Sequence, residues 1–308
     1  MKVAVIGAGA MGSLYGGALA ESGHDVYLID IFEEHVNKIN ERGLCIIRGD
    51  EERIIKDITA TTDAREVGPA DLAIVFVKST VTDIGVKSNL DAIGPDTIVL
   101  TLQNGLGNIE KIAQFVDKKN IIAGTSSNGA TLIEPGTIKQ SGAGGTTIGE
   151  LNGETTDRIK HLAHILNIDS LGPATISNNV MGLIWDKLLV NVGINALTAL
   201  TDLKNGQLLQ YKESIKLLED LVNEGIKVAA ALEIKLTHST PDYCKEVAKV
   251  TGGNVSSMLA DVRNRRKTEI ENINGAIVEY GRKLGIATPV NEILTNLILL
   301  REKSYLGD

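Results

Sequence analysis

The first half of the chain alternates short apolar runs with segments of helical periodicity. Four runs of four to six residues are short and apolar enough to form buried strands of a parallel sheet. These runs are residues 3–6, 26–29, 72–77 and 98–102. Residues 11–22 and 33–42 have helical spacing, and a glycine, Gly23 or Gly43, ends each segment. Strands that alternate with helices predict a doubly wound parallel sheet, an α/β fold.

Residues 120–149 depart from this alternation. Four short strand candidates follow one another there with turn sequences between them. The strand candidates are residues 121–125, 129–133, 137–140 and 146–149, and the turns are residues 134–136 and 142–145. This arrangement predicts an antiparallel extension at the edge of the sheet, closed by a helix over residues 154–166.

The second half of the chain has long stretches of helical periodicity and few strand signals. These stretches are residues 183–200, 214–232, 268–284 and 290–304. The change follows Gly172-Pro173, and we expect a linker near residues 168–178. We therefore predict an α/β domain over residues 1–172 and an all-helical domain over residues 173–308, a division that suits a chain of 308 residues.

The first predicted strand runs directly into Gly7-Ala8-Gly9-Ala10-Met11-Gly12, a GxGxxG pattern. The pattern is weak by itself in a chain with 32 glycines, but its place between a strand and a helix makes it specific. Gly7 permits a tight turn, Gly9 lets a pyrophosphate approach the backbone, and Gly12 lets helix and strand pack closely. The helix N-terminus would offer free N–H groups to the phosphates. The α/β domain is therefore predicted to be a Rossmann-like dinucleotide-binding domain, with a merely flexible turn as the alternative.

The end of the second predicted strand usually decides between NAD and NADP. The chain has Asp30 there, followed by Ile31 and Phe32, with no arginine nearby. An acidic residue binds the ribose 2′-hydroxyl of NAD and would repel the 2′-phosphate of NADP. Asp30 therefore favours NAD(H), and it is also suited to capping the helix that starts near Glu33.

Net charge argues against a nucleic-acid partner. The chain carries a net charge of −8, whereas binding to phosphate backbones needs a basic face. The one basic run, from Arg263 to Lys267, is explained either by a solvated helix face or by a phosphate contact.

Cysteine and hydropathy patterns indicate a cytoplasmic protein. Cys45 and Cys244 match no metal or CxxC spacing, so we expect reduced thiols and no metal site. The N-terminal segment lacks the uninterrupted apolar core of a signal peptide. No segment reaches the roughly 18 consecutive apolar residues of a membrane helix, so no membrane partner is expected.

Two stretches of the second half are more specific than the glycine loop. The first is Trp185-Asp186-Lys187-Leu188-Leu189-Val190-Asn191, followed closely by Gly193-Ile194-Asn195. The second runs from Ser256-Ser257-Met258 to Thr268-Glu269-Ile270-Glu271-Asn272-Ile273-Asn274-Gly275. With the glycine loop and Gln103-Asn104-Gly105, these motifs make nearly the whole chain resemble the ketopantoate reductase family. The resemblance implies reduction of 2-dehydropantoate to pantoate in coenzyme A biosynthesis, usually with NADPH, by a Rossmann-like domain followed by a helical domain.

The resemblance also implies roles for individual residues. It places the catalytic lysine at Lys187 and the catalytic glutamate at Glu269. Asn104 matches an asparagine beside the nicotinamide and substrate, and Lys78 matches a lysine near the cofactor. The residues that match substrate-binding positions are Asn191, Asn195, Asn205 and Ser257. Members of the family often form dimers, so a homodimer is possible.

The residues themselves are compatible with this chemistry and leave alternatives open. Lys187, Asn191 and Asn195 lie at four-residue steps and share one face of a predicted helix, as residues that line a cleft would. In a cleft, Lys187 could donate a proton to a ketone oxygen, but a lysine that reaches solvent explains the same sequence. Glu269 also fits a surface charge, and Ser257 also fits a helix N-cap. The five histidines lie outside these motifs, which disfavours a histidine-based dehydrogenase.

The leading hypothesis is a 2-dehydropantoate 2-reductase that uses NAD(P)H on a small 2-keto acid. The alternative on the same scaffold is an NAD-dependent D-2-hydroxyacid dehydrogenase for branched or aromatic 2-keto acids, because a scaffold alone does not choose a substrate. Asp30 raises this alternative, since the family usually prefers NADPH. A non-catalytic dinucleotide sensor would need the glycine loop but not Lys187, Glu269, Ser257 and Asn104 together.

Overall fold

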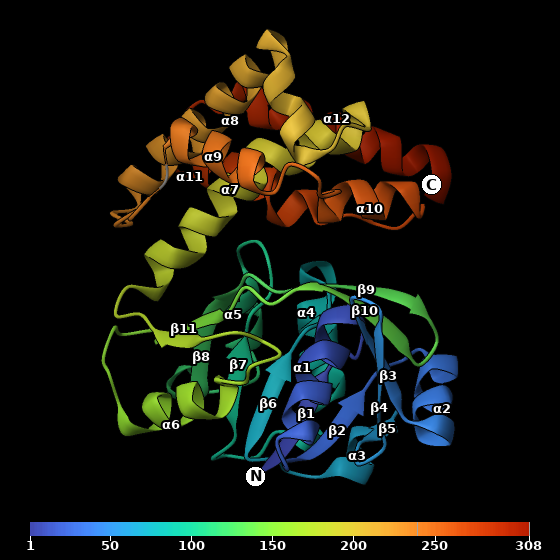
Figure 1. The fold of residues 1–308 in the computed structure, drawn as a ribbon. Helices are drawn as coiled ribbons and strands as arrows, with labels where there is room; N and C mark the ends of the chain where they lie inside the picture. The colour runs from blue at the N-terminus through green and yellow to red at the C-terminus, as the bar shows by residue number, and fades with distance from the viewer. Residues whose placement is uncertain (239, 308) are drawn as a thin grey trace. The chain divides into compact units, whose positions relative to one another are not determined.

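The computed structural model describes residues 1–238 and 240–307 and divides into two compact units (Figure 1). The α/β unit comprises Met1–Gln103 and Asn108–Val180, and the helical unit comprises Asn104–Gly107 and the chain from Met181 onward. The sequence analysis placed the boundary at residues 172 and 173, before the short strand β12 (Ala174–Ile176). β12 pairs with a strand of the main sheet, which keeps the segment up to Val180 in the α/β unit.

Within the described residues, the main sheet of the α/β unit has eight strands in the order β12-β11-β8-β7-β6-β1-β2-β5. Neighbouring strands from β8 to β5 are parallel, and β11 pairs antiparallel with β8. The strand bounds are β1 Lys2–Ile6, β2 Asp25–Ile29, β5 Thr59–Thr61, β6 Leu72–Val75, β7 Ile98–Thr101, β8 Ile121–Ser126 and β11 Thr146–Glu150. The predicted doubly wound sheet is confirmed, and β11 supplies its antiparallel extension.

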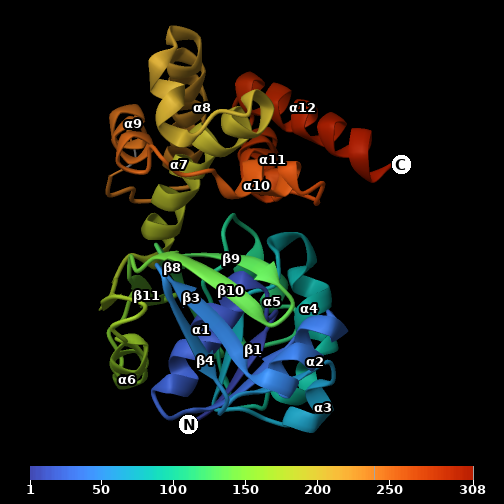
Figure 2. The same ribbon diagram turned by 45° about the vertical axis from the view of Figure 1, so that its right-hand side comes forward.

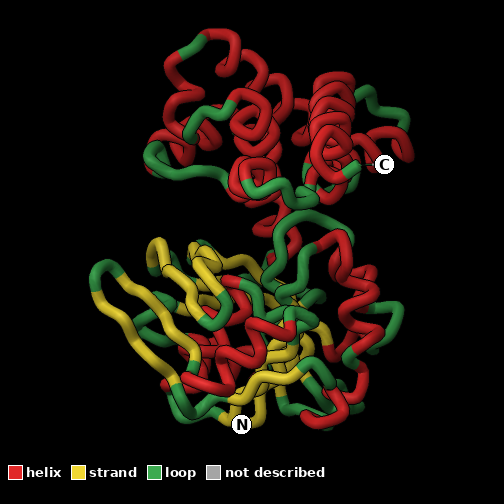
Figure 3. Tube along the Cα trace, turned by 90° about the vertical axis from the view of Figure 1, so that its right-hand side faces the viewer, coloured by secondary structure: helices red, strands yellow, loops and turns green. Residues whose placement is uncertain are grey.

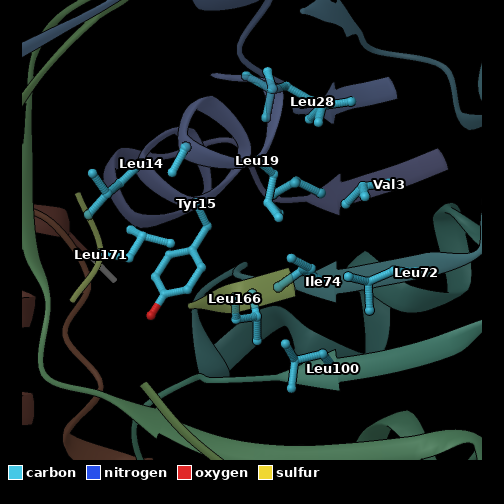
Figure 4. Close-up of a cluster of buried hydrophobic side chains, with 14 of the residues drawn as sticks. Val3, Leu14, Tyr15, Leu19, Leu28, Leu72, Ile74, Leu100, Leu166 and Leu171 are labelled. Carbon is cyan, nitrogen blue, oxygen red and sulfur yellow. The ribbon is translucent and has the colours of Figure 1, made fainter. Parts of the chain in front are cut away.

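Helices cover both faces of the main sheet. Alternate residues of β1 divide between two clusters, because side chains of a strand point to opposite faces. Val3 and Val5 pack with residues of α1 (Ala10–Glu21), α2 (Glu33–Arg42) and α6 (Asp157–Leu166), a cluster that Figure 4 shows in part. Ala4 and Ile6 pack with residues of the remaining helices. These are α3 (Ala64–Val67), α4 (Thr82–Ser88) and α5 (Asn108–Ile112).

A second sheet, in the order β4-β3-β10-β9, packs on α1 (Figure 2). Its strands are β3 Leu44–Arg48, β4 Glu51–Ile55, β9 Gly129–Glu134 and β10 Thr137–Gly142. The sequence analysis assigned β9 and β10 to the edge of the main sheet and did not predict β3 and β4. α1 accounts for the difference, because it is buried on all sides. A Cβ at Gly16 would meet Leu28 of the main sheet, and one at Gly17 would meet Ile46 and Ile55 of the second sheet.

The helical unit contains helices and no strand among its described residues (Figure 3). The helices are α7 Val180–Thr201, α8 Lys212–Ala231, α9 Pro241–Val250, α10 Ser257–Arg263, α11 Asn274–Leu284 and α12 Pro289–Leu306. Glycines let α7 approach its neighbours closely. A Cβ at Gly193 of α7 would meet Cys244 of α9 at 2.7 Å and Val222 of α8 at 2.9 Å. The all-helical prediction is confirmed.

Helix α7 contributes many residues to the core of this unit, from Trp185 to Ala199. Among the described residues it is the one helix long and apolar enough to cross a membrane by length and composition, a property that the sequence analysis overlooked. However, 72% of its most apolar window is buried inside the protein. Burial of this kind is typical of a core helix.

Candidate functional site

The glycine loop follows β1 and leads into α1. Gly7 has a φ of 93°, and a Cβ there would lie 2.5 Å from the backbone N of Val77. A Cβ at Gly12 would lie 2.0 Å from the carbonyl oxygen of Gly7. Gly9 is exposed, and a Cβ there would meet no atom within 4 Å. Side chains are thus excluded at Gly7 and Gly12 by the protein itself, whereas Gly9 leaves open space beside the loop.

The N-terminus of α1 is suited to an anion. Its N-cap, Gly9, has no side chain to bond the first N–H groups, and the first turn holds no acidic residue. The other predicted loop residues lie at this turn, with Ala8 buried and Ala10 and Met11 half-buried. Uncapped N–H groups and the helix dipole favour negative charge. The loop therefore fits the pyrophosphate of a dinucleotide.

A chain of hydrogen bonds holds this loop from behind. The Ser13 hydroxyl donates to the carbonyl of Ala8 over 2.7 Å and lies 3.2 Å from Nε2 of His35. Nδ1 of His35 accepts from the backbone N–H of Gly136 over 2.9 Å, which leaves Nε2 as the protonated nitrogen. Burial lowers the pKa of His35, which favours the neutral ring. Sequence reasoning missed this support, because its three members come from α1, α2 and the β9–β10 turn.

Asp30 lies directly after β2, where it was predicted. Its Oδ1 accepts from the backbone N–H of Phe32 over 3.0 Å, and its side chain is half-buried. The N-cap of α2 is Phe32, without a side-chain bond, so Asp30 does not act as the N-cap. Ile31 is 94% exposed, so an apolar surface adjoins the carboxylate.

The loops after β6 and β7 are tied together by Gln103. Its Nε2 donates to the carbonyl of Val77 over 2.5 Å and to the Thr82 hydroxyl over 2.8 Å. Lys78 is exposed and lies in the first of these loops. In the sheet β6 lies between β7 and β1, and β2 lies on the other side of β1. The glycine loop and Lys78 therefore lie at the carboxyl ends of β1 and β6, at a topological switch point where α/β sheets bind ligands.

In the helical unit, α7 carries three of the predicted residues on one face. Lys187, Asn191 and Asn195 span about 12 Å along the helix at about 1.5 Å per residue. The Lys187 side chain is half-buried by area, but its ammonium is surrounded by protein. Burial lowers the pKa of Lys187 to about 8, and attraction to the Glu269 carboxylate opposes this decrease. The structure thus brings the two predicted catalytic residues together.

Two buried asparagine atoms at this site have no hydrogen-bond partner. These atoms are Nδ2 of Asn195 and Oδ1 of Asn205. The Asn195 and Asn205 residues are 4% and 8% exposed. Nδ2 of Asn205 donates to the Thr251 hydroxyl over 3.0 Å, and its backbone N–H donates to Asn254 over 3.1 Å. Buried polar atoms are rarely unsatisfied in native proteins. A donor and an acceptor left over in this way are suited to a polar ligand.

Ser257 is the first residue of α10, and the residue before it is the cap. The Ser256 hydroxyl accepts from the N–H of Leu259 over 3.1 Å, so the alternative that Ser257 is the N-cap is wrong. Ser256 is also bonded to the Thr198 hydroxyl of α7 over 2.7 Å. Ser257 itself is exposed at the N-terminus of α10. Sequence reasoning missed the Thr198–Ser256 pair, which fixes this end of α10 to the face of α7 that carries Asn195.

The turn that contains Asn104 is bonded to the segment after Glu269. The Leu106 N–H donates to the carbonyl of Asn272 over 3.0 Å, and Nδ2 of Asn272 donates to the Leu106 carbonyl over 3.2 Å. A Cβ at Gly105, whose φ is 80°, would lie 2.7 Å from the Asn272 carbonyl oxygen. These contacts explain why Asn104–Gly107 belong to the helical unit. Asn104 therefore lies in the same unit as Lys187 and Glu269.

No group of three His, Cys, Asp or Glu suited to a metal ion occurs in the part of the chain that the structure describes.

The candidate site residues divide into two sets, one in each unit. The α/β unit holds the glycine loop, Asp30 and Lys78, and the helical unit holds the rest. The second set is Asn104, Lys187, Asn191, Asn195, Asn205, Ser257 and Glu269.

Comparison with known proteins identifies the family. The family model described as "Ketopantoate reductase PanE/ApbA" matches residues 3–153, and its C-terminal counterpart matches residues 179–302. The 2-dehydropantoate 2-reductase of Halobacterium salinarum is 36% identical over 98% of this chain and 99% of its own. The Pyrococcus abyssi enzyme of the same name is 36% identical over 98% of both chains. This chain belongs to the ketopantoate reductase family.

Solved structures show two activities on this family scaffold. The 2-dehydropantoate 2-reductase from Geobacter metallireducens has a TM-score of 0.90 at 28% identity, over 97% of this chain and 99% of its own. A D-mandelate dehydrogenase, solved with NADH and anilino(oxo)acetate, has a TM-score of 0.92 at 34% identity, over 99% of this chain and 100% of its own. The fold and the resemblance inferred from sequence are confirmed. Since both activities occur at similar likeness, the choice of substrate depends on the site.

Proposed function

We propose that this protein is a nicotinamide-dependent 2-dehydropantoate 2-reductase. The observation that carries the proposal is Lys187, an ammonium group whose burial lowers its pKa to about 8 beside Glu269. A general acid works best when its pKa lies near the working pH. At neutral pH Lys187 is still protonated, yet it gives up its proton about 250 times more readily than an ordinary lysine with a pKa near 10.4.

The remaining residues of the helical unit hold and orient the substrate in this proposal. Lys187 donates its proton to the ketone oxygen, and the Glu269 carboxylate holds the ammonium in place. The Ser257 hydroxyl and the N-terminus of α10 receive the substrate carboxylate. The unsatisfied Asn195 donor and Asn205 acceptor suit a hydroxyl group, which both accepts and donates. 2-Dehydropantoate carries a carboxylate, a ketone and a hydroxyl.

The glycine loop holds the cofactor in this proposal. A reduced nicotinamide nucleotide held there would supply the hydride for reduction of the ketone carbon. The exposed Gly9 and the uncapped start of α1 receive its pyrophosphate. Asp30 accepts the ribose hydroxyls, which favours NADH over NADPH.

The test is steady-state reduction of 2-dehydropantoate by the wild type and by Lys187→Ala, with cofactor binding measured in both. We expect the substitution to lower kcat by a factor of at least about 100, within the 10²–10⁴ range of general acid catalysis. Cofactor affinity should be unchanged, since Lys187 lies in the other unit. A near-normal rate in Lys187→Ala would overturn the role of Lys187.

The second candidate is an NAD-dependent D-2-hydroxyacid dehydrogenase. Asp30 and the likeness to an NADH-bound D-mandelate dehydrogenase favour it. It predicts that 2-ketoisovalerate or phenylglyoxylate is reduced with NADH at a higher kcat/KM than 2-dehydropantoate. The same assays with NADPH test Asp30, because Asp30→Ser should raise the NADPH rate relative to the NADH rate.

We further propose a cytoplasmic location and a homodimer. Cys45 and Cys244 are both free thiols, which suits a reducing compartment. α12 exposes three large apolar residues at helical spacing, Ile293, Leu297 and Leu300, which we name the α12 stripe. The opposite face of α12 buries Leu294 and Ile298 in the helical core. A helix apolar on both faces is suited to burial on both sides, as in a subunit interface.

A further inference from the structure

A buried carboxylate that is not among the candidate site residues is bonded to the chain segment that carries Glu269. Glu302, on α12, is 4% exposed. One of its oxygens accepts from the backbone N–H of Thr268 over 2.7 Å and from the Thr268 hydroxyl over 2.5 Å. Both bonds therefore reach the residue immediately before Glu269.

A buried carboxylate at this position would lower the stability of the fold if its only role were packing. Burial of an ionised group carries a desolvation penalty, which an apolar residue of similar size avoids. In return, hydrogen bonds to a charged acceptor are short and about twice as strong as neutral ones. Glu302 therefore gives the Thr268 backbone a more rigid attachment than apolar contacts would.

The attachment continues through Thr268 to both sides of Glu269. The Thr268 hydroxyl accepts from the N–H of Ile270 over 3.2 Å, so the residues before and after Glu269 belong to one hydrogen-bond chain. The carbonyl of Glu269 accepts from the N–H groups of Asn272 and Ile273. One turn after Glu302, the Tyr305 hydroxyl donates to the carbonyl of Arg266 over 2.9 Å. The C-terminal part of α12 thus holds residues 266–270, the segment that carries Glu269, in place.

We propose that Glu302 is a positioning residue of the active site, which holds the backbone of residues 268–270 so that the Glu269 carboxylate stays beside Lys187. The proposal rests on the proposed function, since it takes Lys187 and Glu269 as the catalytic pair. Glu302 acts on the reaction only through Glu269, because its own bonds go to Thr268.

The proposal makes the behaviour of Lys187 depend on a residue of another helix. Attraction to Glu269 raises the pKa of Lys187 against the effect of burial. If Glu302 is lost and Glu269 moves away, burial acts with less opposition and the pKa of Lys187 falls below about 8. Other charged groups near this segment include Asp261 and Arg301, which act with Glu302 on Tyr305, and the ion pair of Lys267 and Glu271 over 3.4 Å.

The test compares Glu302→Ala and Glu302→Gln with the wild type in pH profiles of kcat/KM for keto-acid reduction. Glu302→Ala should lower kcat by about 10–100-fold, the cost of a displacement of about 1 Å in a catalytic group. Its alkaline limb should move to lower pH, with cofactor affinity unchanged. Glu302→Gln keeps an acceptor oxygen for Thr268 and should restore most of the rate and the position of the limb.

Glu224 offers a matched control in the same unit. It is 7% exposed and accepts from the N–H groups of Val290 and Asn291 over 2.9 and 3.0 Å, so it too is a buried carboxylate that holds backbone. Glu224→Ala should lower Tm as Glu302→Ala does but leave the alkaline limb where it is. A limb that moves equally in both variants, or in neither, would overturn the positioning role and leave Glu302 a structural residue.

A second measurement separates this proposal from the proposed function. The rate at which an amine-acylating reagent labels Lys187 can be followed by peptide mass spectrometry as a function of pH, without any substrate. The labelling midpoint should fall in Glu302→Ala and stay in Glu224→Ala. If the wild type reduces no 2-keto acid but this shift occurs, the function is wrong and the positioning role holds; an unchanged midpoint refutes the positioning role.

Discussion

Lys187 determines how the reaction should respond to pH. Reduction of a ketone needs the protonated lysine, so kcat/KM should fall about tenfold per pH unit above a pKa of about 8. Oxidation of the hydroxy acid needs the neutral lysine, so its kcat/KM should rise with pH up to the same value. Glu269→Gln removes the charge that raises the pKa of Lys187, and the reductive limb should move to lower pH. Profiles of both directions check this, and a reductive limb near pH 10 would refute it.

The unsatisfied amide of Asn195 predicts a conflict between stability and binding. A buried polar group without a partner costs about 1–3 kcal/mol, a penalty that an apolar residue of similar size removes. Asn195→Leu should therefore keep or raise the free energy of unfolding, measured in urea without ligand, while it raises the substrate KM. Asn291→Leu is the control, because Nδ2 of Asn291 donates to Leu221 and Glu224 and its Oδ1 accepts from Asn274, so the loss of this buried amide should destabilise the protein. A clear loss of stability in Asn195→Leu would contradict the argument.

At the scale of elements, two adjacent serines at the start of α10 should separate folding from binding. Ser256 caps α10 and is bonded to Thr198, so Ser256→Ala should lower the free energy of unfolding by about 1–2 kcal/mol. Ser257 is exposed and does not cap, so Ser257→Ala should change stability by less than about 0.5 kcal/mol. The substrate KM should rise in Ser257→Ala. Urea unfolding and steady-state kinetics on both variants decide, and equal stability losses would refute the assignment.

The helices and strands also show which features local sequence patterns can predict and which they miss. Periodicity predicted β1, α1, β2 and α2 within a residue or two, because each has its own apolar pattern and a glycine stop. It missed β3 and β4, since β4 reads Glu-Glu-Arg-Ile-Ile and has no alternation. It also missed α9 as a helix, whose buried residues are the small Cys244 and Ala248 and give a weak apolar pattern.

Local sequence patterns also failed to predict which sheet β9 and β10 join, for a different reason. β9 and β10 were expected at the edge of the main sheet, but β10 pairs parallel with β3, about 90 residues earlier in the chain. The choice of sheet depends on the second apolar face of α1, which needs a sheet to cover it.

Local sequence patterns likewise reveal only part of the functional site. The motifs gave Lys187 and Glu269, whereas Glu302 has no motif and is defined only by its contact with Thr268.

At the scale of the whole molecule, each unit has its own hydrophobic core, as domains do. The glycine loop, Asp30 and Lys78 are therefore held by a different core from the predicted catalytic residues, whereas Asn104, predicted beside the nicotinamide, lies in the unit of Lys187 and Glu269. Substitutions that weaken one core should leave the other set of residues in place. This separation is the reason that cofactor affinity serves above as a control for Lys187 and Glu302.

The α12 stripe predicts the oligomeric state. Ile293, Leu297 and Leu300 are 57%, 44% and 64% exposed and lie on one side of the helix. Large apolar residues gathered in this way usually mark an interaction surface, and a two-fold axis beside α12 would bring two copies of the stripe together. Analytical ultracentrifugation should therefore find a dimer in the wild type and a monomer in the Leu297→Glu, Leu300→Glu double variant.

Leu306 provides the control for this experiment. It lies on the same helix and is 50% exposed, but at about 100° per residue it points away from the stripe. Leu306→Glu should remain dimeric, whereas a general effect of added charge would dissociate it as well. A wild type that is monomeric at micromolar concentration would show that the stripe serves another purpose. Because the stripe is made of residues that the helical core does not use, the double variant should keep its Tm under conditions where the wild type is diluted to monomer.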